Sequence, residues 1–153
     1  MVAAPLVVVL MAAIHGIAGR DRKTLGLIAL SFGVIMAGLT SGVHFTALTA
    51  GRQTGGPVLQ WPSTAYALEL LAWDVFLGLS LLFAAPVFVG AGVFAAARWS
   101  LAIAGGLCLA GTIGPITGSM PLQRIGILGY GVVLPIACVF LARAFRRRAE
   151  VEG

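Results

Sequence analysis

Five long apolar stretches, separated by short polar breaks, occupy almost the whole chain and constrain its fold more than any other feature. A bilayer core ~30 Å thick is crossed by ~20 apolar residues in a helix. Because backbone amides in lipid must form hydrogen bonds within their own segment, runs of this length are expected to be helices. Only 10% of the residues are charged, whereas about a quarter are charged in a typical soluble domain. We therefore predict an all-α, polytopic membrane helix bundle.

A single integral membrane domain, residues 1–153, is expected to hold five transmembrane helices. Their approximate ranges are 2–18, 24–50, 64–89, 99–118 and 121–142. The first stretch lacks a basic leading region, and a charged turn follows it where a signal peptide would have a small-residue cleavage site. We therefore interpret this stretch as a retained helix.

The basic residues are distributed unevenly when the five stretches are threaded through a bilayer in turn. One face receives eight of them: Arg20, Arg22, Lys23, Arg98, Arg143, Arg146, Arg147 and Arg148. The opposite face receives only Arg52 and Arg124. By the positive-inside rule the N-terminus is expected outside and the C-terminus in the cytoplasm, as in a multi-pass protein of the cell membrane. This placement accounts for the net charge of +5 without a nucleic-acid partner.

Several polar side chains are expected at matching depths in the outer leaflet. With a rise of ~1.5 Å per residue, His44 and Glu69 lie ~6–9 Å below the outer boundary. By the same reckoning, Thr40, Ser41 and Asp74 lie ~14 Å deep and Arg124 ~5 Å deep. These residues would line one outward-opening crevice between the second, third, fourth and fifth helices. Trp73, Thr112 and Thr117 are candidates for its wall.

Asp74 is the most informative of these residues, because a carboxylate in the middle of a membrane helix costs ~2.5–3.5 kcal/mol on insertion scales. One interpretation is a protonatable site that binds a proton, a cation or an amine. The other is a hydrogen-bonded acid that ties the third helix to Thr40 or Ser41. Glu69 is shallow enough to reach interfacial water or to pair with Arg124. The two acids are five residues apart, about 140° around an α-helix, so a paired-carboxylate active site is not indicated.

No motif in the sequence indicates a metal, a cofactor or a compact catalytic site. His15 and His44 are separated by ~20 Å along the bilayer normal, too far to share one metal ion. Cys108 and Cys138 lie in apolar runs without the spacing of a metal site or a disulfide. No phosphate-binding loop, HExxH motif or nucleophile elbow is present.

Three functions remain open from the sequence. The first is a small carrier or ligand-binding subunit with an outward-facing polar pocket, linked to a proton or to a small cation or amine. The second is a structural or assembly protein whose polar residues only join helices. The third is a membrane-embedded enzyme that acts on a lipid or a quinone. Five helices are few for a complete transporter, so a homo-oligomer or a larger membrane complex is expected for the first.

Overall fold

The computed structural model describes residues 3–55 and 58–152, and all regular secondary structure within those ranges is helical. Val2, where the first helix was expected to begin, and Gly56 and Pro57 of the outer loop lie outside the described residues. The helices are α1 (Ala3–Ile17), α2 (Lys23–Leu48), α3 (Ala50–Thr54), α4 (Thr64–Leu70), α5 (Leu77–Ala84), α6 (Val93–Gly111), α7 (Ile113–Thr117), α8 (Met120–Leu128) and α9 (Leu134–Glu152). Two π-helical segments, η2 (Leu71–Phe76) and η4 (Gly129–Val133), and two 3₁₀ turns, η1 (Arg20–Arg22) and η3 (Ala85–Val87), connect them.

These elements join into long rods suited to a bilayer. Within the described ranges, four rods are long and apolar enough to cross a membrane: Arg20–Thr54, Thr64–Val87, Val93–Thr117 and Met120–Glu150. The apolar helix α1 is shorter, at 15 residues. The expectation of an apolar helical bundle is therefore confirmed, while a membrane-crossing role for α1 stays a prediction.

Two helices extend beyond the ranges expected from hydropathy. α6 begins at Val93 instead of near residue 99, and α9 runs to Glu152 instead of ending near residue 142. The added residues are mainly Ala and Arg, which favour helix even where they are too polar or too small to mark a span. Hydropathy therefore located the apolar part of each rod and not its ends.

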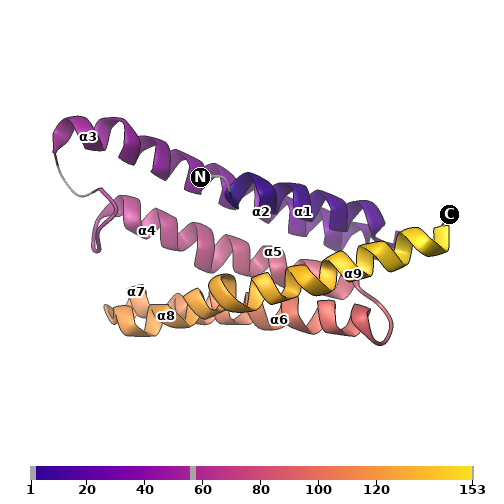
Figure 1. The fold of residues 1–153 in the computed structure, drawn as a ribbon. Helices are drawn as coiled ribbons and strands as arrows, with labels where there is room; N and C mark the ends of the chain where they lie inside the picture. Colours follow the sequence, from indigo (N-terminus) through magenta and orange to yellow (C-terminus); the bar gives the residue numbers. More distant parts are fainter. Residues whose placement is uncertain (1–2, 56–57, 153) are drawn as a thin grey trace.

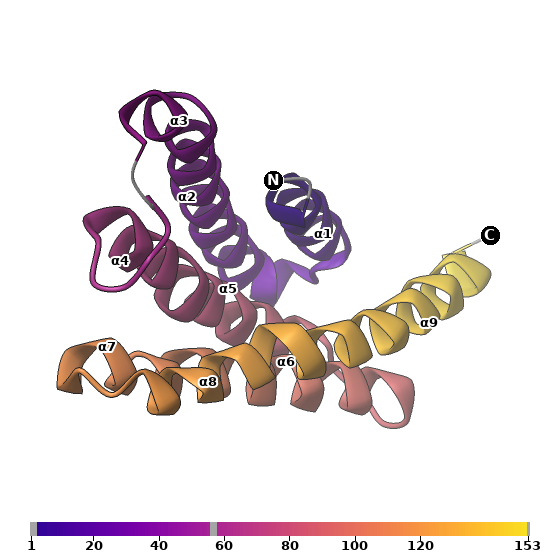
Figure 2. The ribbon, with the colours of Figure 1, turned by 60° about the vertical axis from the view of Figure 1, so that its left-hand side comes forward.

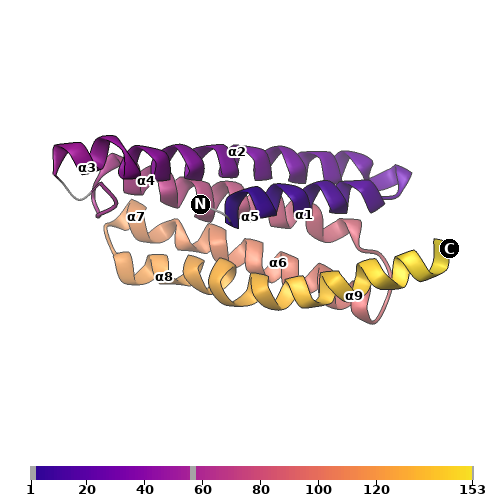
Figure 3. The ribbon, with the colours of Figure 1, turned by 45° about the horizontal axis from the view of Figure 1, so that its top comes forward.

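The rod formed by α4, η2 and α5 is the centre of the bundle. α1 and α2 pack along one side of it, and α6 packs along the other side and against α8 and α9. Figures 1, 2 and 3 show this order, with the central rod between the α1–α2 pair and the α6–α9 pair. Over an apolar stretch of 18 residues, 56% of the central rod is buried. The corresponding shares are 39% in Arg20–Thr54, 33% in Val93–Thr117 and 22% in Met120–Glu150. Polar groups on this rod are therefore the ones most enclosed by protein.

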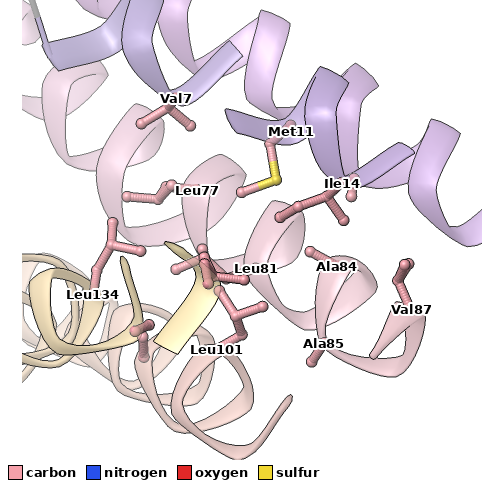
Figure 4. Packing of buried hydrophobic residues seen from close by; sticks show 14 of the residues in the cluster. Val7, Met11, Ile14, Leu77, Leu81, Ala84, Ala85, Val87, Leu101 and Leu134 are labelled. Atoms are coloured by element: carbon pink, nitrogen blue, oxygen red, sulfur yellow. The ribbon is translucent and has the colours of Figure 1, made fainter. Parts of the chain in front are cut away.

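The core is packed with small and medium side chains. Met11 and Ile14 of α1 meet Leu81 of α5, and Leu101 of α6 and Leu134 of α9 close the same cluster from the other side (Figure 4). Many alanines lie between these residues, which lets the helix backbones approach closely, as in membrane bundles.

Large apolar side chains cover much of the outer surface. Ile116 is 81% exposed and Phe45 is 63% exposed, and further exposed leucines, isoleucines and valines lie on every long rod. Soluble proteins rarely present apolar surface on this scale, whereas lipid-facing helices require it. The fold and surface together favour a membrane environment.

Candidate functional site

Asp74 lies at the centre of the bundle, in the π-helical segment η2. Its side chain is 1% exposed, and Nε2 of Gln123 on α8 donates a hydrogen bond to its Oδ2 over 3.2 Å. Its second oxygen, Oδ1, is buried without a hydrogen-bond partner among the described residues. The carboxyl group therefore links the central rod to α8 and keeps one acceptor position unused.

Two glycines make room for this carboxyl group. A Cβ atom on Gly126 of α8 would overlap Asp74, lying 3.0 Å from its Cγ. A Cβ on Gly111 of α6 would lie 2.7 Å from Cα of Gly126 and 3.3 Å from Cγ of Asp74. The backbones of α6 and α8 thus pack directly against each other and against Asp74. This packing leaves Asp74 enclosed by protein.

A second polar group surrounds Glu69 on α4. Nε1 of Trp73 donates a hydrogen bond to Oε1 of Glu69 over 2.8 Å, and Nδ1 of His44 lies 3.7 Å from the same oxygen. Nδ1 of His44 is also 2.9 Å from the carbonyl oxygen of Thr40. Because a carbonyl can only accept, Nδ1 is assigned as the protonated nitrogen. The other carboxylate oxygen of Glu69, Oε2, is buried without a partner in the part of the chain described.

Glu69 lines a pocket of ≈ 260 Å³ whose walls are mostly aromatic. The lining residues are Tyr66, Glu69, Leu70, Trp73 and Tyr130. The rings of Trp73 and Tyr130 have centroids 5.2 Å apart and are tilted by 52°. All of these residues except Leu70 are partly exposed, so the pocket is reached from the surface. A carboxylate with aromatic faces around it is the combination that attracts organic cations.

Two of the three aromatic side chains that line this pocket come from π-helical segments. Trp73 belongs to η2 and Tyr130 to η4. π-helical turns are rare and occur frequently at functional sites, because the wider turn redirects side chains out of the regular α-helical register. The coincidence of two such segments at one pocket marks it as the strongest candidate site in the described structure.

The residues expected to line one crevice are divided between these two groups. Glu69, His44 and Trp73 are brought together, with Thr40 supplying its backbone carbonyl, whereas Asp74 has its hydrogen bond to Gln123 on another helix. The Thr40 hydroxyl is buried and faces Sδ of Met36 at 4.0 Å, and Ser41 is partly exposed.

The remaining predicted residues lie apart from both groups. Arg124 is exposed on α8 and makes no hydrogen bond or ion pair with another described residue. The hydroxyls of Thr112 and Thr117 bond to carbonyl oxygens of their own turns, at 2.6 Å to Leu109 and 2.7 Å to Ile113. Neither threonine lines the aromatic pocket.

Three residues of the site were missed in the sequence: Gln123, Tyr66 and Tyr130. Gln123 carried a usable signal, because an amide inside an apolar helix needs a hydrogen-bond partner. The tyrosines carried a weaker one, since tyrosine is common at membrane interfaces. Among the described residues, no group of three or more His, Cys, Asp or Glu side chains is arranged to hold a metal ion.

Fold and surface define the class as an apolar helical bundle with four helices of membrane-spanning length in the described residues. No protein-family model matches the chain, and no significant match is found among curated proteins or solved structures. The functional argument therefore depends on the site itself.

Proposed function

We propose that this protein is a small multi-pass membrane protein that binds a small organic cation or amine, acting as a carrier or as the binding subunit of a larger complex. The observation that carries the proposal is the Glu69 carboxylate in a pocket lined by aromatic side chains, among them Trp73 and Tyr130, whose rings pack against each other. Cation–π contacts contribute ~0.5–2 kcal/mol each, and Glu69, which lines the same pocket, supplies the counter-charge for an ammonium group.

The proposal includes an orientation. With α1 counted as a fifth transmembrane helix, the N-terminus would lie outside and the arginine-rich C-terminus in the cytoplasm, following the eight-to-two distribution of basic residues. α4 and α8 lie at the end of the bundle away from the C-terminus (Figures 1 and 3). In this orientation the pocket opens toward the exterior leaflet of the cell membrane.

Binding can be measured with tetramethylammonium chloride on protein purified in a neutral detergent. Trp73 both lines the pocket and bonds to Glu69, so a Trp61→Phe/Trp99→Phe background makes its fluorescence a local reporter. We expect a saturable change with tetramethylammonium and none with tert-butanol, a neutral molecule of similar shape. Equal responses to both would show that the pocket does not recognise charge and would refute the proposal.

Glu69→Gln is the decisive variant. It keeps the shape of the side chain and an acceptor for the Trp73 indole, but it removes the charge. Tetramethylammonium has no N–H to donate, so what Glu69→Gln removes is charge attraction, which for unit charges ~4 Å apart is about 1 kcal/mol in water and about 4 kcal/mol near a protein surface; the affinity is expected to fall by about tenfold or more. Asp21→Asn, which removes an exposed carboxylate from η1, is the matched control and should bind like the wild type. An unchanged affinity in Glu69→Gln would exclude this carboxylate from the site.

The alternative function, a structural or assembly protein, is favoured by Asp74 rather than by Glu69. Asp74 is enclosed by Gly111, Gly126 and Gln123, as expected for a group that joins helices. Under this alternative, Asp74→Asn and Gln123→Leu lower stability in detergent while Glu69→Gln has no consequence for any ligand. Asp74→Asn is expected to lower stability under either function, so the two are separated by whether Glu69→Gln weakens the binding of a cation.

A further inference from the structure

A groove at the opposite end of the bundle combines a cationic rim with an apolar floor. Its volume is ≈ 470 Å³, and it lies between the first turns of α6 and the last turns of α9. Val93, Ala96 and Phe140 form the floor. The charged side chains on its rim are Arg143, Arg146, Arg147 and Glu150.

The arginines on this rim differ from other basic residues at the same end. Arg22 donates to the carbonyl of Pro86, Arg98 donates to the carbonyl of Phe88 over 3.2 Å, and Lys23 donates to the last carbonyls of α1. Those three side chains are therefore engaged in hydrogen bonds to backbone carbonyls within the protein. Arg143, Arg146 and Arg147 have no such partner among the described residues, and all three are exposed. Their guanidinium groups are free to bind an anion from outside.

A second, more apolar hollow on α9 shares part of the cationic rim. This second hollow of ≈ 420 Å³ is lined by Cys138, Val139 and Ala142 and shares Arg143 and Arg146 with the first. Cys138 and Val139 lie one to two turns closer to the middle of the apolar rod than the arginines do. The two hollows together present a place for a charged head and, next to it, a place for a hydrocarbon chain.

We propose that this groove binds the phosphate group of an anionic phospholipid, with Arg143, Arg146 and Arg147 around the phosphate and an acyl chain along Cys138–Val139–Ala142. Guanidinium groups bind phosphate oxygens in pairs of parallel hydrogen bonds, and basic pockets between membrane helices are typical of anionic headgroup sites. A general attraction of surface arginines to the bilayer requires neither an apolar floor nor two hollows that share the same arginines. The proposal depends on the membrane class of the protein and not on the Glu69 pocket.

The test uses the full chain in neutral detergent and two short-chain lipids, dioctanoylphosphatidylglycerol and dioctanoylphosphatidylcholine, with binding followed by calorimetry. We expect saturable binding of the anionic lipid and at least tenfold weaker binding of the zwitterionic one. Arg146→Gln removes one cation near the phosphate and should lower the affinity for phosphatidylglycerol about fivefold. One basic residue at a membrane surface contributes ~1 kcal/mol, which corresponds to this change. Arg20→Gln removes an exposed cation outside the groove and should leave the affinity unchanged.

Two further variants separate a lost site from a damaged fold. Glu150→Gln removes a carboxylate from the rim and should raise the affinity for phosphatidylglycerol several-fold, a gain that misfolding cannot produce. Ala96→Phe fills the apolar floor without altering any charge and should weaken binding.

Three results would overturn the proposal. The first is an equal loss of affinity in Arg20→Gln and Arg146→Gln, which would indicate attraction to overall charge. The second is no gain in Glu150→Gln. The third is competition by inorganic phosphate at the concentration of the lipid, which would assign the arginines to a soluble anion. Cation binding at Glu69 is measured separately and is unaffected by any of these outcomes.

Discussion

Gly126→Ala tests how the centre of the bundle is held together. Gly126 lies where α8 crosses α6, directly beside the carboxyl group of Asp74. A methyl group there would overlap Asp74 and lie 3.4 Å from Cα of Gly111. Since backbone atoms are on one side and a buried acid on the other, neither neighbour can move without changing the packing of two helices.

The expected cost follows from three contributions. Overpacking of a tight interior costs about 1–3 kcal/mol. Displacing Asp74 also weakens its 3.2 Å hydrogen bond from Gln123, a loss of about 0.5–1.5 kcal/mol. Replacing Gly by Ala within a helix returns up to about 1 kcal/mol. Gly126→Ala should therefore destabilise the protein by about 2 kcal/mol, from a balance of these three terms.

Gly42→Ala supplies the matched control, because the space around that position is open. No atom lies within 4 Å of a Cβ built on Gly42 of α2, so the same substitution adds helix propensity without overpacking. Its effect should lie between about 0 and 1 kcal/mol of stabilisation. Unfolding of both variants by sodium dodecyl sulfate titration, followed by circular dichroism, gives the comparison. If Gly126→Ala is as stable as Gly42→Ala, the close crossing of α6 and α8 at Asp74 is wrong.

Two further predictions concern the link between α2 and α5 and the orientation of the chain. Ser80→Ala removes the 2.7 Å hydrogen bond to the Ala29 carbonyl and should lower the free energy of unfolding by about 0.5–1.5 kcal/mol in the same titration. The control is Ser31→Ala, which should cost less because the Ser31 hydroxyl bonds within its own helix. Equal effects of the two substitutions would contradict the interhelical role of Ser80. Single cysteines at Arg20 and Arg52, in a background without Cys108 and Cys138, should react with a membrane-impermeant maleimide from the cytoplasmic and the external side respectively. The reverse pattern would refute the proposed orientation.

The class of fold could be predicted from the sequence because it depends on quantities that add up along the chain. The length and hydropathy of each apolar run determine whether a helix can satisfy its backbone and remain in lipid. In the sequence, small and polar residues also recur at intervals of three and four and predict one buried stripe on the second span: Gly33, Ala37, Thr40, Ser41 and His44. The first three are buried in α2, whereas Ser41 and His44 are partly exposed. Summed or periodic signals of this kind tolerate an error of one or two residues.

The site could not be predicted to the same extent, because side-chain direction changes by ~100° with each residue of a helix. Arg124 was expected in the crevice, but its neighbour Gln123 is the residue that faces Asp74. Arg124 is one residue further along the helix, and its side chain is exposed. The π-helical segments η2 and η4 shift the register again within the rods. Hydropathy carries no signal for such a shift. Trp73 was therefore predicted as a wall residue, whereas Tyr130, which packs against it, was not.

The two acids of the central rod show how one helix separates structural and binding roles. Asp74 faces α6 and α8, where glycines let the backbones close around it, so any ligand reaching it would have to separate two packed helices. Glu69 lies on the same rod before the π-helical segment, among aromatic side chains that are too wide to pack as closely and that leave a hollow of ≈ 260 Å³. Among the described residues both acids keep one buried oxygen without a hydrogen-bond partner, and Glu69 is the acid that lines the hollow of ≈ 260 Å³ proposed to admit a small cation. The size of the neighbouring side chains, more than the depth of the acid in the bilayer, therefore decides which carboxylate is available for function.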